Sequence, residues 1–181
     1  SFWTGELWLA YAISNDSYYR DAAKSHLQSF RERLDNNVDL SHDVGFLYTL
    51  SARAQYQLCD DVDARVLGLA AANRLAARYN PQGKYIQAWG KVGDSAEAGR
   101  FIVDSMLNIP LLYWASAESG DARFFDIANS HAYTTLQYIV RDDGSTAHTY
   151  LKDPSTGEPL GQKTHQGYSD ESLWARGQAW A

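Results

Sequence analysis

Cysteine is almost absent from this sequence: Cys59 is the only one among 181 residues, so no internal disulfide can form. No run approaches the ~18 apolar residues that a membrane span needs. Positive charge is also scarce, with 16 Lys and Arg against 22 Asp and Glu and a net charge of −6. We therefore expect neither a membrane protein nor a general nucleic-acid-binding surface. The compartment stays open; we predict the cytoplasm, with the periplasm as the alternative.

Motifs for metal, cofactor and nucleophilic chemistry are missing too. The five histidines form no HxxxH pattern and no cluster with the cysteine. There is no P-loop, no GxGxxG and no GxSxG. The sequence accordingly predicts no metal site and no cofactor, and it leaves the oligomeric state open.

Aromatic residues, by contrast, are abundant: there are 6 Trp and 12 Tyr in a chain that is 45% hydrophobic and 21% charged. Such a composition is typical of a folded globular protein. Several aromatic residues stand beside glycine, as Trp89 stands beside Gly90. Most aromatic side chains of a domain belong to its core, but a flat apolar face with a polar edge also suits stacking on sugar rings.

A 3.6-residue period of apolar residues dominates the chain, and no segment keeps a two-residue alternation. Clusters of Gly, Pro, Asn and Asp at 80–83, 119–121 and 142–144 separate the periodic segments. The longest stretch without a helical pattern is 141–168, and long ordered loops are often functional. We predict helices near 5–14, 17–35, 43–58, 62–79, 96–118, 121–140 and 169–181.

An internal repeat organises these helices. Residues 15–26 (NDSYYRDAAKSH) align with 120–131 (GDARFFDIANSH), and a weaker copy begins at Asp63. Each copy opens with an Asp suited to capping a helix N-terminus. Units of about fifty residues that hold two helices are typical of stacked helical hairpins. With the evenly apolar helices 43–58 and 96–118 inside, such hairpins form an all-α toroid if the ring closes and a solenoid if it stays open.

Both ends of the sequence look cut. It starts at Ser1 without Met, and it stops at Ala181 inside a helical pattern that has no C-cap residue. We therefore expect 1–181 to be one α/α-toroid catalytic domain, truncated at both ends. An unclosed toroid exposes the apolar faces of its inner helices, so this piece by itself is expected to be inactive or poorly soluble.

Asp104 is a charged residue in a strongly apolar segment. It lies in residues 100–114 (RFIVDSMLNIPLLYW), which at helical spacing are apolar on almost every face. The one polar stripe of this predicted helix runs through Arg100, Asp104 and Asn108. A buried carboxylate costs several kcal/mol unless it is paired, hydrogen-bonded or protonated. Two interpretations stay open: a structural network of these three side chains, or a carboxyl with a raised pKa that lines a cavity as a general acid.

Asp43, in residues 41–48 (SHDVGFLY), falls in the first turn of a predicted helix. A negative charge there stabilises the helix, and the same position is expected to keep the carboxylate ionised. Two carboxyl groups whose environments push their pKa values apart are the usual arrangement for dividing acid and base roles. Pro110 should kink the inner helix just beyond the polar stripe and widen a cavity there.

Other polar candidates lie later in the chain. His148 and Gln166 are on the long loop, where an exposed side chain without a role is the commoner case. The last predicted helix starts at Ser169 and places Ser172, Arg176 and Trp180 on one face. That face is either an ordinary amphipathic surface or a cation and an indole turned toward an anionic sugar.

Five segments, in the same order over the length of the chain, resemble the unsaturated glucuronyl hydrolases, glycoside hydrolase family 88. They are 3–5 (WTG) with 7–11 (LWLAY), between which the chain is shorter than the family pattern, then 41–48 (SHDVGFLY), 102–115 (IVDSMLNIPLLYWA), 145–148 (STAH) and 167–180 (GYSDESLWARGQAW). The match covers about half of such a family's catalytic domain. The resemblance implies an (α/α)6 barrel, of which this chain would be an incomplete portion, in agreement with the toroid inferred from the repeats.

The resemblance also implies a reaction, namely the release of a 4,5-unsaturated uronic acid from the non-reducing end of oligosaccharides made by polysaccharide lyases. Asp104 would protonate C4 and activate the water that attacks C5, while Asp43 would hydrogen-bond the sugar and help keep Asp104 protonated. Arg176 or His148 could offset the uronate charge. The oligosaccharide is the only partner implied. The positions matching the family's sugar site are His42, Trp89, His148, Gln166, Trp174, Arg176 and Trp180.

Two other functions remain in competition. The related unsaturated rhamnogalacturonyl hydrolases share fold and mechanism, and pectin-derived against glycosaminoglycan-derived disaccharides would separate the two activities. A non-catalytic helical-repeat carbohydrate-binding module has no need of coupled acids, so an ordinary pKa for Asp104 would favour it.

Overall fold

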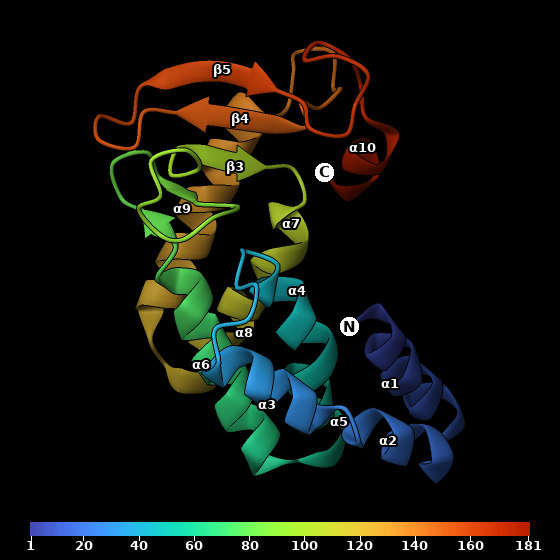
Figure 1. Cartoon of the computed structure of the whole chain (residues 1–181). Helices are drawn as coiled ribbons and strands as arrows, with labels where there is room; N and C mark the ends of the chain where they lie inside the picture. Colours follow the sequence, from blue (N-terminus) through green and yellow to red (C-terminus); the bar gives the residue numbers. More distant parts are fainter.

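The computed structural model describes all residues, 1–181, as a helical part with a small antiparallel sheet at one end (Figure 1). The longer helices are α1 (Phe2–Ser14), α2 (Ser17–Lys24), α3 (Leu27–Asp35), α6 (Val62–Ala76), α8 (Pro110–Ser119) and α9 (Ala122–Tyr138). The shorter helical segments are α4 (Val44–Tyr48), the π-helical turn η1 (Thr49–Arg53), α5 (Ala54–Cys59), α7 (Ser105–Asn108) and α10 (Ala175–Trp180). The strands are β1 (Tyr79–Asn80), β2 (Tyr85–Ile86), β3 (Arg100–Ile102), β4 (Thr149–Lys152) and β5 (Pro159–Lys163). None of the helices is both long enough and apolar enough to cross a membrane.

Aspartate caps begin the three helices of the internal repeat. The side chains of Asp16 and Asp121 accept hydrogen bonds from backbone N–H groups in the first turns of α2 and α9, as the sequence predicts. In the middle copy the cap of α6 is Asp61, and Asp63 lies in the first turn. These local contacts end the preceding loops at defined residues.

The main core lies among the helices. It joins 19 buried residues, against four in the cluster beneath the sheet, so helix packing dominates the fold. Helix α8 packs against α4, α6 and α9, and its Leu111 and Leu112 are fully buried. The segment predicted to supply an inner helix therefore does so from Pro110 onward.

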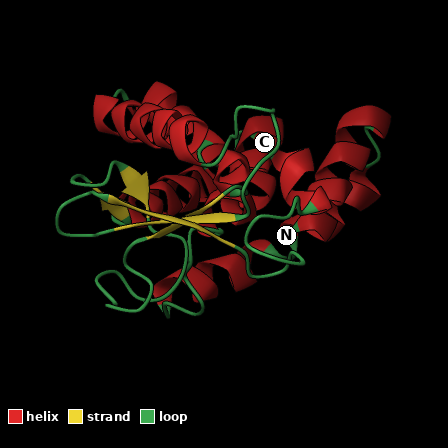
Figure 2. Ribbon diagram, turned by 90° about the horizontal axis from the view of Figure 1, so that it is seen from above, coloured by secondary structure: helices red, strands yellow, loops and turns green.

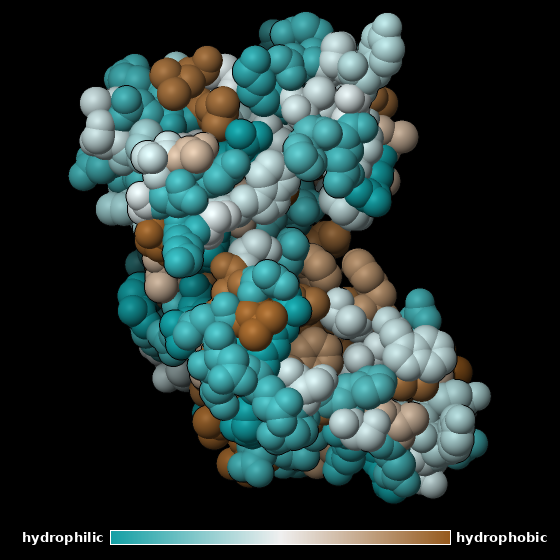
Figure 3. Space-filling view, viewed as in Figure 1, coloured by the Kyte–Doolittle hydropathy of each residue, from teal (hydrophilic) through white to brown (hydrophobic).

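Helix α1 leaves much of its apolar surface uncovered. Phe2, Trp3, Leu9 and Ile13 are each more than half exposed. Figure 3 shows apolar side chains gathered in the hollow between the sheet end of the molecule and its N-terminal helices. An apolar face of this kind is a candidate contact surface for another part of a protein.

The sheet was not predicted, because no segment alternates polar and apolar residues over a useful length. Its order is β3-β4-β5, with Phe101 opposite Tyr150, and β4 and β5 form an antiparallel hairpin inside the predicted loop 141–168. Figure 1 shows these strands at one end of the molecule, and Figure 2 looks down on them, with helices visible on both sides. Long-range pairing with β4 decides the conformation of β3, and a local pattern does not report such pairing.

The predicted helix 96–118 is wrong at its start. Residues 100–102 are strand β3, and the helical conformation resumes only at Ser105. The polar stripe through Arg100, Asp104 and Asn108 is therefore not formed, and Arg100 Nε instead lies 2.7 Å from a carboxylate oxygen of Glu97. A short apolar run cannot by itself be assigned to a buried strand or a buried helix. Pro110 begins α8 rather than kinking a longer helix.

The boundaries of other predicted helices also differ from those in the structure. Helix α10 covers only Ala175–Trp180, and residues 169–174 before it form turns and bends. The predicted helix 17–35 is divided between α2 and α3, and 43–58 is interrupted by η1. The shortening of α10 places residues 164–174 in an irregular segment that packs over the sheet.

Gly45 allows α4 and α7 to approach each other closely. A Cβ at this position would lie 2.4 Å from both the Cα and the backbone oxygen of Asn108, a distance at which the backbone would have to move. At this contact the Oδ1 atom of Asn108 accepts a hydrogen bond from the backbone N–H of Phe46 at 2.9 Å. The contact thereby fixes the first turn of α4 against α7.

We predict that Gly45→Ala destabilises the protein. Alanine improves helix propensity by roughly 0.5–1 kcal/mol, but the clash with the Asn108 backbone costs roughly 1–3 kcal/mol and wins. Gly5→Ala is the matched control, because that helical glycine faces only the flexible side chain of Leu50 at 3.1 Å. Urea unfolding of both variants measures the difference. A Gly45→Ala protein as stable as the control would show that the approach of α4 to α7 is not tight.

Candidate active site

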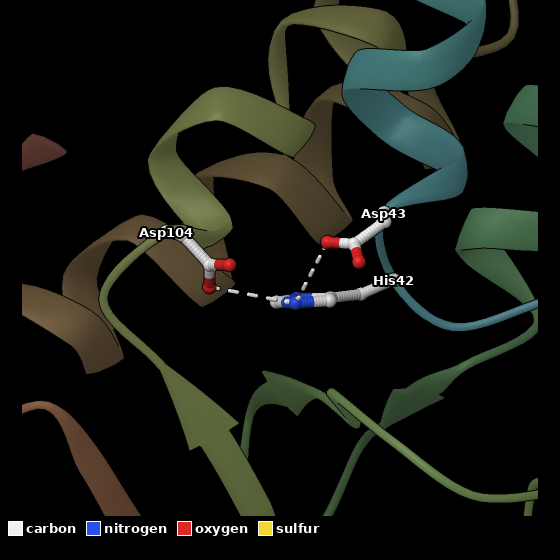
Figure 4. Close-up of side chains that lie close together, drawn as sticks. All are labelled: His42, Asp43 and Asp104. Atoms are coloured by element: carbon white, nitrogen blue, oxygen red, sulfur yellow. Dashed lines mark ion pairs between the residues drawn. The ribbon is translucent and has the colours of Figure 1, made fainter. Parts of the chain in front are cut away.

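His42, Asp43 and Asp104 form a compact cluster where two helices begin. Asp43 is the residue before α4 and Asp104 the residue before α7. The Nε2 atom of His42 lies 3.4 Å from Oδ1 of Asp43 and 3.4 Å from Oδ1 of Asp104, so the imidazole stands between the two carboxyl groups (Figure 4). The His42 side chain is fully buried, whereas those of Asp104 and Asp43 are 16% and 37% exposed. The cluster is therefore closed on the histidine side and open on the carboxyl side.

Backbone contacts hold this cluster in place. The backbone N–H of His42 donates to the carbonyl oxygen of Ala88 at 2.9 Å, which ties it to the segment after β2. Asp104 follows β3, where the N–H of Val103 donates to the carbonyl oxygen of His148 at 3.1 Å. Neither aspartate side chain makes a capping hydrogen bond to its own helix. The two carboxyl groups are thus left to point at His42.

The environment of Asp104 favours its protonated form. Burial, followed by the negative charge of Asp43, raises the pKa of Asp104 to about 7. Burial lowers the pKa of His42 to about 3, so this imidazole is neutral at physiological pH and does not neutralise either carboxyl. A raised pKa disfavours the prediction of a binding module with an ordinary Asp104.

The prediction that a helix N-terminus holds the pKa of Asp43 low is wrong. Burial raises the pKa of Asp43, and hydrogen bonds from Ser41 and Asn108 only oppose this rise. Helix α4 has five residues and Asp43 does not cap it, so the macrodipole is weak. Asp43 nevertheless acts as the ionised neighbour that raises the pKa of Asp104. Asp43 therefore loses its proton before Asp104 does.

The same three side chains are the one group in the chain whose ligand atoms, all within 4.8 Å of one another, could share a metal ion. An imidazole with two carboxylates is a ligand set that zinc accepts. A metal here would displace the proton that the cluster retains on Asp104. We interpret the cluster as an acid–base pair joined by a neutral histidine.

A second cluster gathers five of the predicted sugar-site residues. The guanidinium of Arg176 lies 4.5 Å from the ring centre of Trp174 and 5.2 Å from that of Trp180. The rings of His148 and Trp174 have their centres 4.2 Å apart and are tilted by 34°, and Gln166 accepts a hydrogen bond from Arg176. The positive charge of Arg176 also acts on Asp104, whose pKa it lowers slightly against the larger raising effects. The second cluster is therefore near enough to act on a ligand held at Asp104.

His148 differs from its prediction in two ways. It lies on the loop, in the bend immediately before β4, but it is buried and not exposed. Burial, followed by electrostatic repulsion from neighbouring basic groups that include Arg176, lowers the pKa of His148 to about 4, which favours Arg176 over His148 as the cation for a uronate. Its Nδ1 accepts the backbone N–H of His165 at 3.0 Å, which leaves Nε2 as the protonated nitrogen of the neutral ring. His148 can thus donate one hydrogen bond to a ligand.

Trp89 stands apart from the second cluster. Its ring meets His165 edge-on at 5.0 Å and the guanidinium of Arg100 at 5.1 Å. Together with Asp43, Trp89 lines a cavity of about 860 Å³ whose wall does not include Asp104. Two of the nine predicted residues therefore border this cavity, and the others lie outside it.

Three contributions were missed from the sequence. The sequence places His42 next to Asp43, but no local pattern indicates that His42 also contacts Asp104. Asn108 was assigned to a stripe with Arg100, but it bonds to α4. Arg78 was not among the predicted site residues. It is buried, and its guanidinium donates hydrogen bonds to the backbone oxygens of Leu40 and of residues 87–90. An arginine inside an otherwise apolar helix end was the one available indication of its burial.

No protein-family model matches the chain. Among curated proteins it is 48% identical over 180 residues to the unsaturated chondroitin disaccharide hydrolase of Streptococcus pneumoniae (strain R6), covering 99% of this chain and 45% of the relative. It is 46% identical over 180 residues to the unsaturated glucuronyl hydrolase of Bacillus sp. (strain GL1), covering 99% and 48%. The chain thus spans about half the length of the curated relatives it matches.

Solved structures agree with this similarity. The crystal structure of the unsaturated glucuronyl hydrolase of Bacillus sp. GL1, responsible for the degradation of glycosaminoglycan, matches with a TM-score of 0.95 and 46% identity, over 99% of this chain and 48% of that one. An Asp-to-Asn variant of the Streptococcus agalactiae enzyme, complexed with dGlcA-GalNAc6S, matches with a TM-score of 0.77 and 42% identity, over 99% and 42%. The predicted fold class, a helical α/α-barrel type of fold, is confirmed.

We predict that Asp104→Asn makes protein stability less dependent on pH. The pKa of Asp104 rises from 3.8 to about 7 on folding, so its stabilising contribution is complete below pH ~4 and is lost as pH rises through about 7. The difference in unfolding free energy between Asp104→Asn and the parent should therefore shift in favour of the variant, on the order of 3 kcal/mol, as the pH rises from 4 to 8. Urea unfolding at both pH values measures this. Asp126→Asn, an exposed position on α9, is the control, and a difference from the parent that does not change with pH contradicts the raised pKa.

Proposed function

Over the length that it spans, this chain belongs to the family of the unsaturated glucuronyl hydrolases, and on that premise we propose its reaction. The protein releases a 4,5-unsaturated uronic acid from the non-reducing end of lyase-generated oligosaccharides by hydrating the C4=C5 bond. The observation that carries this proposal is the buried pair Asp43 and Asp104 around a neutral His42. The names of the relatives favour glucuronyl over rhamnogalacturonyl substrates.

The geometry of the pair argues against ordinary glycoside hydrolysis. That reaction needs two carboxyl groups on opposite faces of the sugar, one of them aimed at the anomeric carbon or its attacking water. Here both Oδ1 atoms point at the same imidazole, so no sugar ring fits between them. A reaction that needs a single proton-transferring acid suits this arrangement better.

Asp104 supplies that acid. With a pKa of about 7 it carries its proton in a large fraction of molecules at neutral pH, and its partly exposed side chain can reach a substrate. The O–H bond of Asp104 breaks as a C4–H bond forms, and the positive charge that develops at C5 is shared with the ring oxygen. Water then adds to C5 and returns a proton to Asp104, which regenerates the acid.

The cleavage follows from the hydration. The product of water addition is a hemiketal, in which the bond between C5 and the ring oxygen breaks to leave a ketone at C5 and a hydroxyl at C1. The C1 hemiacetal then collapses to an aldehyde and releases the next sugar. No redox partner is needed, and the protein has only to supply and recover one proton.

Asp43 and His42 tune this acid. The charge of Asp43 raises the pKa of Asp104, so it keeps the proton in place until the substrate arrives. The exposed part of the Asp43 side chain can accept a hydrogen bond from a sugar hydroxyl. His42, neutral and buried, lies between the two carboxyl groups and can donate its one N–H to the ionised one.

The second cluster provides side chains that can bind the substrate. Arg176 is its cation, held between two indole rings, and it can pair with the uronate carboxylate. Trp174 and Trp180 offer flat faces to a sugar, while Gln166 and the Nε2–H of His148 offer hydrogen bonds. Trp89 borders the site on the cavity side.

Replacing the acid should abolish turnover and spare binding. Asp104→Asn keeps the shape of the side chain but has no proton to transfer, so the loss of ultraviolet absorbance of an unsaturated disaccharide should slow by roughly 10²–10⁴-fold or more. Calorimetric titration should show a Kd close to that of the parent. Asp126→Asn is the control for loss of a carboxyl elsewhere. Turnover that survives in Asp104→Asn would rule out the proposed role.

The pH profile should depend on Asp43. Turnover falls above pH about 7 as Asp104 loses its proton. In Asp43→Asn the neighbouring negative charge is gone, so the pKa of Asp104 falls and the alkaline limb of kcat/KM moves to lower pH. Rates measured from pH 5 to 9 for parent and variant test this. An alkaline limb that stays in place would mean that Asp43 does not act on the acid through its charge.

A further inference from the structure

His131 is a second buried histidine, and it takes no part in the proposed reaction. It lies in α9 and, like His42, is fully buried. Burial, followed by electrostatic repulsion from the basic His42, lowers the pKa of His131 to about 3, so both rings are neutral at physiological pH. A neutral imidazole has one nitrogen that donates a hydrogen bond and one that accepts. The place of each proton therefore decides which contacts the two rings can make.

A backbone contact fixes the proton of His131. The N–H of Ile86, in β2, donates to Nδ1 of His131 at 3.0 Å. Since Nδ1 is the accepting nitrogen, the proton of the neutral ring lies on Nε2. The Nε2 atom is buried and has no hydrogen-bond partner among the protein groups. A buried donor left without an acceptor is unfavourable, so Nε2–H requires one nearby.

His42 offers the matching acceptor. Its Nδ1 atom is also buried and also lacks a hydrogen-bond partner. Both histidines contact the same short segment, because Ile86 donates to His131 and the carbonyl oxygen of Ala88, two residues later, accepts the backbone N–H of His42. The electrostatic effect of His42 on His131 is further evidence that the two rings are neighbours. One unpaired buried donor and one unpaired buried acceptor thus lie close together in the interior.

We propose that His131 is a positioning residue, which sets the tautomer of His42 by donating its Nε2–H to Nδ1 of His42, directly or through one bridging water. Either route makes Nδ1 of His42 the acceptor and places the proton of that ring on Nε2. This nitrogen lies 3.4 Å from Oδ1 of Asp43 and 3.4 Å from Oδ1 of Asp104 (Figure 4). With the other tautomer, His42 would turn a lone pair toward the ionised Asp43 and could not donate to it.

Nitrogen NMR of the imidazole rings tests the tautomers in the parent protein. We expect the proton on Nε2 in both His131 and His42, with the signals assigned from the single variants His131→Gln and His42→Gln. A His42 ring that carries its proton on Nδ1, or that exchanges between the two forms, overturns the proposal. The effect on turnover rests on the proposed function, but this spectrum does not. A failure of either is therefore seen separately.

Two variants of His131 test the consequence for the reaction. His131→Leu removes the donor, so the His42 tautomers should mix and kcat should fall roughly 10- to 100-fold with KM little changed. His131→Gln keeps an amide donor and should restore most of kcat and the Nε2–H form of His42. His26→Leu is the matched control, because His26 holds the same place in the other copy of the repeat and contacts Thr4 instead.

A His42 tautomer that is the same in His131→Leu as in the parent would overturn the proposal, even if kcat falls, since His131 would then act only on the fold. Equal losses of kcat in His131→Leu and His131→Gln, with no recovery of the tautomer, would overturn it as well. If His131→Leu does not fold, the spectra of the parent and of His131→Gln decide the question.

Discussion

The site depends on one close contact, in which the backbone of α4 lies against Asn108 at the end of α7. Only glycine at position 45 allows this approach, since a Cβ there would overlap the Asn108 backbone. The contact brings together two helix N-termini from distant parts of the chain, and with them Asp43 and Asp104. A buried imidazole then fills the space between the two carboxyl groups. Without that approach the two acids would be independent surface residues.

The burial of this pair determines its chemistry. A charged histidine would neutralise one carboxylate, but burial keeps His42 neutral, with a pKa of about 3. Ionising both carboxyl groups in such surroundings is energetically unfavourable, so the pair retains one proton, and Asp104 holds it. Helix dipoles contribute little, because α4 and α7 are short and neither aspartate caps its helix. Desolvation and like-charge repulsion, acting in the same direction, are the larger effects.

The sheet places the remaining residues around this acid. Asp104 follows β3, and the pairing of β3 with β4 brings His148 alongside it. The hairpin β4–β5 then leads the chain back to Gln166 and to α10, which carries Arg176 and Trp180. Arg78 lines the cavity beside Asp43 and holds part of its wall through hydrogen bonds to backbone oxygens. Asp43 thus belongs both to the acidic cluster and to the wall of the cavity.

Local chemistry in the sequence was enough to predict the helical hairpins, the caps at Asp16 and Asp121, and an acid in an apolar segment, because periodicity and capping involve neighbours in the chain. The resemblance to a family named the further candidates, five of which, Arg176 included, the structure gathers into one cluster. Only the tertiary structure decided that residues 100–102 form a strand, that His42 bridges the acids, that the pKa of Asp43 is raised, and that His148 is neutral. Strand pairing and desolvation join residues far apart in the chain, so they follow from packing and not from a local pattern.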